Sequence, residues 1–226
     1  MTLTNSSGGS GSRSTGSGST GTGSTESGNT GSATGGSTVP PTTKFNDVGA
    51  SYSWAQFAIE DLAAKGIIKG TGNGNFEPAQ NVTRADFITM IVRALGLKAD
   101  FATNLEDISK TAYYYDAVGI AKTLGIVQGE DDNHFGAQSP ITRQDMMVIV
   151  NRALKVTGKS LERASLGNIS GYTDVSLVSD YGAAAVAELI HSGIIQGSNN
   201  EINPLGTATR AETVVVIYRL LQKQFV

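Results

Sequence analysis

The sequence of 226 residues contains no cysteine, which excludes disulfide bonds and thiolate metal sites. It has no uninterrupted apolar run of 18 residues, so insertion into a membrane is not expected. Positive charge is also scarce: 17 Lys and Arg stand against 20 Asp and Glu, and no basic block occurs. Nucleic acid is therefore not expected as a partner.

Patterns typical of catalysis and metal binding are missing as well. The two histidines, His134 and His191, lie in unrelated positions, and no serine forms a nucleophile motif with a histidine and an acid. The acidic run Glu130-Asp131-Asp132-Asn133 lacks the ligand spacing of a calcium loop and is typical of a solvated turn. We therefore expect no enzyme activity, no catalytic residue, no cofactor and no metal.

Residues 1–43 have the composition of a flexible linker. Between Thr2 and Thr43, Gly, Ser and Thr each occur 11 times and together make up 33 of 42 residues. Such a segment cannot bury enough apolar surface to offset its ordering entropy, so we predict a disordered tether. Its first residues have neither the basic nor the apolar part of a signal peptide. Because export would need a signal further upstream, we expect the chain to be the C-terminal piece of a longer protein.

One pattern occurs three times in the rest of the chain. The copies open with Phe45-Asn46-Asp47-Val48, Leu105-Glu106-Asp107-Ile108 and Tyr172-Thr173-Asp174-Val175. A Thr-Arg motif follows, and its arginine lies 37, 36 and 36 residues after the aspartate. Successive aspartates are 60 and then 67 residues apart, because the second connection is longer. We divide this region into repeat 1 (residues 44–98), repeat 2 (104–155) and repeat 3 (171–226).

Each repeat has the signals of two helices joined by a turn-rich loop. The first helix ends at a glycine that suits a left-handed C-terminal position: Gly66, Gly125 or Gly193. One apolar loop residue is expected to insert into the core: Phe76, Phe135 or Ile202. The second helix has amphipathic spacing. Because one helix pair is too small to bury its apolar face, we predict a mainly α fold of three helix-loop-helix repeats packed with pseudo-threefold symmetry.

A Thr-Arg-x-acid motif begins each second helix. The copies are Thr83-Arg84-Ala85-Asp86, Thr142-Arg143-Gln144-Asp145 and Thr209-Arg210-Ala211-Glu212. The spacing predicts a capping box, in which the Thr hydroxyl accepts a helix N–H and the acid accepts the Thr N–H. The arginine faces the positive end of the helix dipole, which disfavours it by roughly 0.3–1 kcal/mol. We interpret each arginine as the partner of an anionic ligand that also meets the helix N–H groups, in a groove between repeats, with little contribution to stability. The alternative is an arginine paired with an acid of a neighbouring repeat.

The ordered set in repeat 1 resembles the S-layer homology repeat, and the other two copies match it. The set comprises Phe45-x-Asp47-Val48, Trp54, Gly66-Ile67-Ile68-x-Gly70, Phe76-x-Pro78 and Thr83-Arg84-Ala85-Asp86. The resemblance implies a monomeric module in which the three repeats of one chain form a pseudo-trimer. Such a module holds a larger secreted protein non-covalently to a bacterial cell wall. It implies as partner a secondary cell wall polysaccharide, often one containing pyruvylated N-acetylmannosamine. The alternative is a structural module that binds another protein, with the arginines in inter-repeat salt bridges.

The resemblance also implies roles for residues of the repeats. The motif arginines Arg84, Arg143 and Arg210 would contact the pyruvate ketal in grooves between repeats. The loop glycines Gly70, Gly129 and Gly197 would let the backbone approach the sugar closely. The first-helix aromatics Trp54, Tyr113 and Tyr181 are assigned to the core, with sugar stacking as the alternative. The opening aspartates Asp47, Asp107 and Asp174 are assigned as caps, with bonds to sugar hydroxyls as the alternative.

The three copies differ from the family pattern at a few positions. Asp86 and Asp145 stand where Glu is usual, and we expect the capping box to persist with a shorter side chain. Repeat 2 has Gln144 in place of Ala and Ala137 in place of the loop Pro, and repeat 3 has Ile202 in place of the loop Phe. These changes are expected to alter the affinity of individual grooves, most of all the second, and not the fold.

Overall fold

The computed structural model describes residues 44–129 and 133–225, and the tether predicted for residues 1–43 lies outside them. The described residues form six α-helices, four short 3-10 helices and no β-strand, which confirms the mainly α prediction. The α-helices are α1 (Ser53–Ala64), α2 (Arg84–Ala94), α3 (Tyr115–Thr123), α4 (Arg143–Val156), α5 (Ala183–His191) and α6 (Arg210–Gln222). The 3-10 helices are η1 (Ala50–Tyr52), η2 (Leu166–Ile169), η3 (Val175–Leu177) and η4 (Asp180–Gly182).

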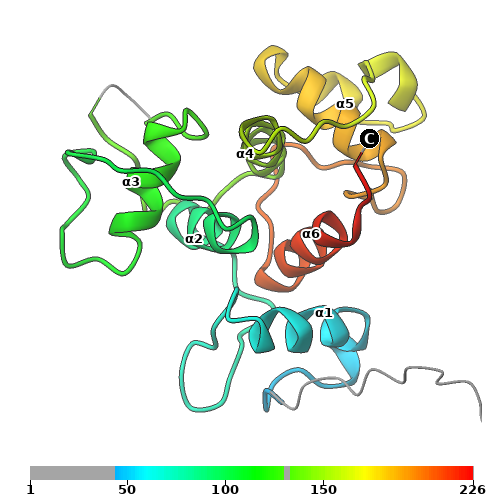
Figure 1. Ribbon diagram of the computed structural model, residues 1–226. Helices are drawn as coiled ribbons and strands as arrows, with labels where there is room; N and C mark the ends of the chain where they lie inside the picture. Colours follow the sequence, from blue (N-terminus) through cyan, green and yellow to red (C-terminus); the bar gives the residue numbers. More distant parts are fainter. Residues whose placement is uncertain (1–43, 130–132, 226) are drawn as a thin grey trace, which may run out of the picture. The chain divides into compact units, whose positions relative to one another are not determined.

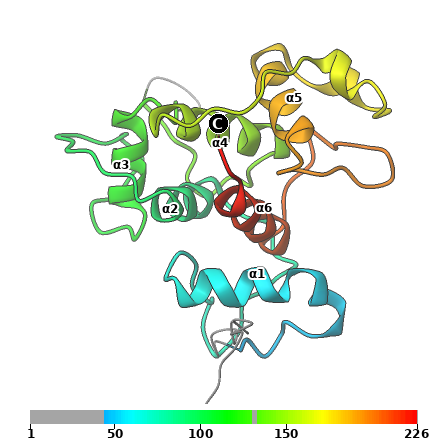
Figure 2. The same cartoon turned by 45° about the vertical axis from the view of Figure 1, so that its right-hand side comes forward.

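The first helix of each repeat packs against the second helix of the preceding repeat. Helix α3 lies against α2, α5 against α4, and α1 of repeat 1 against α6 of repeat 3. Figure 1 shows α2, α4 and α6 on the inside of this arrangement, with α1, α3 and α5 around them, and Figure 2 shows the same order after rotation. The packing pairs therefore cross the repeat boundaries, and repeat 3 closes the cycle on repeat 1, as the predicted pseudo-threefold symmetry requires.

A ring of three backbone hydrogen bonds joins the repeats where they meet. The Val82 N–H donates to the Ala208 carbonyl (2.9 Å), the Ile141 N–H to that of Val82 (3.0 Å), and the Ala208 N–H to that of Ile141 (3.4 Å). All three residues are fully buried. A buried peptide group without a partner is costly, so each repeat depends on both of the others here.

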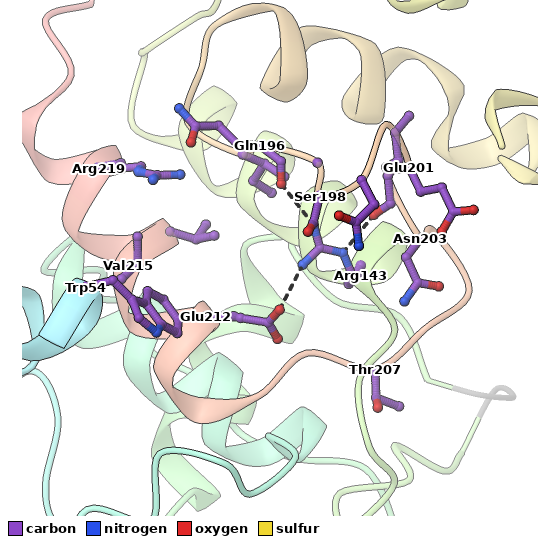
Figure 3. A pocket seen from close by; sticks show the side chains of 15 residues that line it. Trp54, Arg143, Gln196, Ser198, Glu201, Asn203, Thr207, Glu212, Val215 and Arg219 are labelled. Carbon is purple, nitrogen blue, oxygen red and sulfur yellow. Dashed lines mark hydrogen bonds and ion pairs between the residues drawn. The ribbon is translucent and has the colours of Figure 1, made fainter. Parts of the chain in front are cut away.

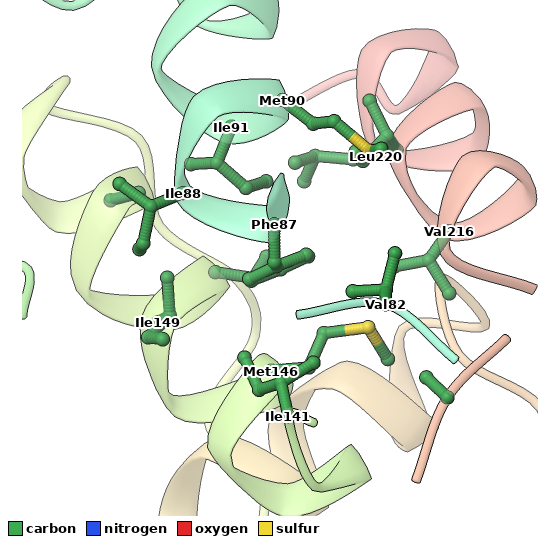
Figure 4. Close-up of a cluster of buried hydrophobic side chains, with 14 of the residues drawn as sticks. Val82, Phe87, Ile88, Met90, Ile91, Ile141, Met146, Ile149, Val216 and Leu220 are labelled. Atoms are coloured by element: carbon green, nitrogen blue, oxygen red, sulfur yellow. The ribbon is translucent and has the colours of Figure 1, made fainter. Parts of the chain in front are cut away.

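The apolar stripes of α2, α4 and α6 meet in one core. Figure 4 shows Phe87, Met146 and Val216, each from a different repeat, within the same cluster. The expected loop residues Phe76, Phe135 and Ile202 are fully buried, as are Met146 and Met147. The glycines that end α1, α3 and α5 have φ of +69° at Gly66, +70° at Gly125 and +75° at Gly193, which confirms their left-handed conformation.

Two features of the helices concern their outer surfaces. Phe57 belongs to the apolar pattern of α1, yet its side chain is half exposed and packs edge-on against Tyr218 of α6 at 5.6 Å between ring centroids. Among the residues that the structure describes, none of the helices has the length and apolar composition that crossing a membrane requires.

Candidate functional site

Each motif arginine reaches into the loop of the following repeat and donates to two main-chain carbonyls. Arg84 of repeat 1 enters the loop of repeat 2, Arg143 enters that of repeat 3, and Arg210 returns to that of repeat 1. For Arg84, Nε lies 3.1 Å from the Phe135 carbonyl oxygen and Nη2 lies 3.4 Å from that of Gln128. For Arg143, the corresponding distances are 2.8 Å to Ile202 and 3.3 Å to Gln196. For Arg210, they are 2.9 Å to Phe76 and 3.0 Å to Lys69.

Burial and aromatic contacts distinguish these arginines from ordinary surface cations. Arg143 and Arg210 are buried, and the guanidinium groups of Arg84 and Arg210 stack on the rings of Phe135 (4.9 Å) and Phe76 (4.6 Å). Burial lowers the pKa of Arg210, an effect that the carboxylate of Asp86 and other nearby acids oppose. Each arginine joins two repeats through charge-assisted hydrogen bonds, which favours a larger contribution to stability than the sequence led us to expect.

The alternative of an inter-repeat ion pair applies to one motif arginine within the described part of the chain. Arg143 Nη1 lies 3.8 Å from Glu212 Oε1 of repeat 3. That separation exceeds the 2.7–2.9 Å or so of a charge-assisted hydrogen bond, so the pair is weak. Carbonyl oxygens, rather than acids, are the main acceptors for all three side chains.

The N-termini of α2, α4 and α6 are not free to bind an anion. The carbonyls of Ser139 and Ala137 accept the first two N–H groups of α2, and the loops of repeats 3 and 1 do the same for α4 and α6. The N–H of the motif acid donates to the Thr hydroxyl in each copy. The predicted convergence of helix N–H groups on a ligand is therefore wrong. Ala137 supplies its carbonyl as Pro78 and Pro204 do, so the missing proline leaves this contact intact.

The reciprocal capping box is complete only in repeat 3. There Glu212 Oε2 accepts the Thr209 N–H at 2.8 Å. Asp86 and Asp145 accept the hydroxyl of their own motif threonine instead, and their other carboxylate oxygens accept the hydroxyls of Tyr113 and Tyr181. The expectation that the box persists with Asp is wrong, because a side chain one methylene shorter turns toward the tyrosine.

The three opening aspartates bind the loops of their own repeats rather than capping a helix. Asp47 accepts the N–H groups of Phe76 (2.8 Å) and Glu77 (2.7 Å). Asp107 binds Phe135 and Gly136 in the same way, and Asp174 binds Ile202 and Asn203. The cap assignment is wrong. Because the carbonyl of the same loop residue accepts the arginine of the preceding repeat, one peptide segment lies between a carboxylate and a guanidinium.

The loop glycines let the loop fold closely on itself. A Cβ at Gly70 would lie 2.5 Å from the Asn75 carbonyl oxygen and 2.8 Å from the Phe45 ring. At Gly197 it would overlap the Glu201 carbonyl and the Tyr172 ring. These contacts explain Gly70 and Gly197 without a ligand, although Gly70, Gly129 and Gly197 also line the grooves described next.

The assignment of the three aromatics to the core is wrong, and only Trp54 lies on a first helix, because Tyr113 precedes α3 and Tyr181 lies in η4. The exposed fractions are 55% for Trp54, 64% for Tyr113 and 59% for Tyr181. Each ring instead lines a groove that belongs mainly to the preceding repeat. Equivalent residues of all three repeats therefore contribute to every groove.

The three grooves have one plan. The loop and second helix of one repeat form the floor, the motif arginine comes from the repeat before, and the aromatic comes from the repeat after. Groove 1 (about 410 Å³) has Arg210, Asp86 and Tyr113; groove 2 (about 230 Å³) has Arg84, Asp145 and Tyr181; and groove 3 (about 510 Å³, Figure 3) has Arg143, Glu212 and Trp54.

A second arginine, not predicted from the sequence, lines each groove. Arg93, Arg152 and Arg219 each lie nine residues after a motif arginine, on the same helix. Arg93 is exposed and Arg219 half-buried, and neither makes a hydrogen bond or ion pair with another described residue. Arg152 has one long contact, from Nη1 to the Ile126 carbonyl at 3.5 Å. Figure 3 shows Arg219 and Arg143 on opposite sides of groove 3. The three second arginines could have been predicted from the sequence, because each lies at the same offset from a motif arginine.

Comparison with known proteins agrees with this architecture. The family described as "S-layer homology domain" matches residues 44–88, 104–147 and 171–214. Similar proteins include an amylopullulanase of Thermoanaerobacterium thermosulfurigenes (35% identical over 181 residues, 79% of this chain and 10% of the relative). An exoglucanase, XynX, of Acetivibrio thermocellus is 34% identical over 181 residues (79% of this chain, 16% of the relative). A surface-layer 125 kDa protein of Lysinibacillus sphaericus is 28% identical over 188 residues (81% of this chain, 15% of the relative).

The chain belongs to the S-layer homology domain family, as three tandem repeats. Domains of this family are non-catalytic modules that bind cell-wall components, and the protein is secreted and associated with the cell wall. It spans a small part of the relatives that it matches, 10% of the amylopullulanase and 16% of the exoglucanase.

Proposed function

We propose that the chain anchors its protein to the cell wall by binding an acidic, pyruvylated secondary cell wall polysaccharide in the grooves between repeats. The observation that supports this is the groove plan itself, which places two arginines and an exposed aromatic together three times. Carboxylates are bound well by guanidinium groups, and aromatic rings stack on the apolar faces of sugars.

The two arginines of a groove have different roles in this proposal. The motif arginine uses Nε and Nη2 to hold the adjacent loop. Its Nη1 is the group proposed to meet the ligand, and in Arg143 this atom lies 3.8 Å from Glu212 Oε1. The second arginine is free of such contacts in grooves 1 and 3 and supplies the more available positive charge. A ligand carboxylate is therefore expected between Arg210 and Arg93 in groove 1, and between Arg143 and Arg219 in groove 3.

The test replaces the second arginines, which do not join the repeats. A triple variant with Arg93, Arg152 and Arg219 changed to Ala should keep its melting temperature and lose binding to purified cell-wall sacculi. Each occupied groove should lose about 1.5–3 kcal/mol if a charge-assisted contact is removed. Avidity across three grooves can mask single changes, so singles and the triple variant are compared on a monovalent pyruvylated disaccharide and on sacculi.

The matched control changes three exposed cations that line none of the grooves, Lys44, Lys98 and Lys110, to Ala. This variant should bind like the wild type. Chemical removal of pyruvate from the sacculi should abolish wild-type binding. Two outcomes would contradict the proposal. Binding that survives pyruvate removal would favour a protein partner, and a control variant that loses binding as fully as the arginine variant would indicate a non-specific charge effect.

A further inference from the structure

The three grooves differ in how firmly the aromatic side chain is held. In groove 2 the Tyr181 hydroxyl donates to Asp145 Oδ1 at 2.8 Å and accepts from Gln144 Nε2 at 2.9 Å. In groove 1 the Tyr113 hydroxyl donates to Asp86 Oδ1 at 2.6 Å. In groove 3 the Trp54 side chain makes no hydrogen bond with any described residue.

The space within each groove follows the same order. Groove 2, with two hydrogen bonds to its tyrosine, encloses about 230 Å³; groove 1, with one, about 410 Å³; and groove 3, with none, about 510 Å³. Gln144 is buried and is itself fixed, because its amide nitrogen donates to the Ser179 hydroxyl and its amide oxygen accepts the Ser179 N–H. A tyrosine bonded across a groove joins its two walls and occupies space that a sugar would need.

The acid at the centre of the groove also differs. In grooves 1 and 2 a carboxylate oxygen of Asp86 or Asp145 points to the tyrosine across the groove. In groove 3 Glu212 Oε2 turns away to the Thr209 N–H and hydroxyl at the helix terminus. Its Oε1 lies 3.8 Å from Arg143 Nη1, a separation at which an incoming carboxylate can displace it. In grooves 1 and 2 the hydrogen bond to the acid thus fixes the aromatic side chain, whereas in groove 3 the acid is held at the helix terminus and the aromatic is not bonded to it.

We propose that groove 3 is the principal glycan site, and that the tyrosine hydrogen bonds to Asp86 in groove 1, and to Asp145 and Gln144 in groove 2, hold those grooves at lower affinity. This inference rests on the proposed function. The ligand is an acidic sugar that stacks on the exposed Trp54 ring while its carboxylate reaches Arg143 and Arg219. Trp offers the largest aromatic surface for such stacking.

The only tryptophan in the chain makes the test specific, because intrinsic tryptophan fluorescence reports on groove 3 alone. The full chain is titrated with a monovalent pyruvylated N-acetylmannosamine disaccharide, followed by fluorescence and by calorimetry. The fluorescence change should saturate with the first equivalent of ligand bound. Trp54→Ala should weaken that first event at least tenfold, and Trp54→Phe should weaken it less. The matched control is Phe57→Ala, an exposed aromatic of the same helix that lines none of the grooves, which should bind like the wild type.

A second pair of variants tests the tyrosine hydrogen bonds. Tyr181→Phe combined with Gln144→Ala, and separately Tyr113→Phe, should strengthen the later, weaker binding events seen by calorimetry. If the first equivalent binds without changing Trp54 fluorescence, or if Trp54→Ala keeps its affinity, groove 3 is not the principal site while the proposed function stands. If the wild type gives no binding heat and no fluorescence change, the proposed function itself fails.

Discussion

The guanidinium of Arg210 is buried and donates to two carbonyls of repeat 1, whereas that of Arg84 is half-buried and forms longer hydrogen bonds. Arg210→Ala should therefore lower the free energy of unfolding by about 2–4 kcal/mol, since it removes charge-assisted bonds and leaves carbonyls unpaired. Arg84→Ala should cost less. Urea unfolding measures both, with Arg93→Ala as the control that leaves stability unchanged. Equal stability of the Arg210 and Arg93 variants would show that the inter-repeat bonds contribute nothing.

Tyr181 provides a pH-dependent observable at the residue scale. Desolvation of its hydroxyl and the bond to Asp145 raise its pKa to about 12. The folded state thus holds this proton more tightly than the unfolded state, so the stabilisation is complete below about pH 10 and is lost as pH rises toward 12. Ultraviolet titration of the phenolate should show a late-ionising tyrosine in the wild type. Asp145→Asn should move that ionisation to lower pH, and an unchanged titration would contradict the assigned bond.

Individual residues differ in how much of their role the sequence shows. The position of Arg84, Arg143 and Arg210 beside the grooves follows from their recurrence, and Arg93, Arg152 and Arg219 could have been found in the same way. The partners of Asp47 could not have been found from the sequence. Its carboxylate oxygens accept hydrogen bonds from peptide N–H groups 29 and 30 residues away, and almost any residue type can supply such a group.

At the scale of the elements, the loop after α5 brings the Glu201 carbonyl and the Tyr172 ring close to the Cα of Gly197. Gly197→Ala should destabilise the protein by about 1–3 kcal/mol, because the added methyl group would overlap the Glu201 carbonyl and the Tyr172 ring. Gly171→Ala is the matched control, since a Cβ there would meet nothing within 4 Å. Thermal melting compares the two. If both variants melt alike, the close approach is not needed for stability.

The helices were predictable only partly in extent and in packing. The Thr-Arg motifs gave the starts of α2, α4 and α6, the glycines gave the ends of α1, α3 and α5, and the stripe of α2 gave its buried face. The starts of α1, α3 and α5 have no side-chain cap, and Tyr113 and Tyr181 lie before α3 and α5. An amphipathic pattern shows which face is buried and not which neighbour covers it, so the packing of α3 on α2 had no sequence signature. The same limit explains Trp54, Tyr113 and Tyr181, whose helical spacing suits the core although each lies at a groove.

At the scale of the whole molecule, stability depends on closing the cycle of repeats. Removal of residues 171–226 would break the hydrogen bond from Arg210 to the loop of repeat 1 and expose the face of α1 that packs on α6. It would also leave the Val82 N–H without its acceptor, the Ala208 carbonyl. We expect the remainder to be unfolded or self-associated, and repeat 2 alone to behave likewise. Circular dichroism with sedimentation measures both. A monomeric fragment with a sharp melting transition would contradict the dependence of each repeat on the other two.

The ring of hydrogen bonds between Val82, Ile141 and Ala208 has no first or last member, although the covalent chain does. The hydrogen bonds of this ring therefore do not depend on which repeat comes first in the covalent chain. A circular permutant that opens between Ala99 and Asp100, with a flexible peptide joining the end of α6 to Lys44, should fold with the same helix pairs and the same three grooves. Any of the three repeats could then carry a protein fused to it, and the point at which a pulling force enters the module could be chosen by design.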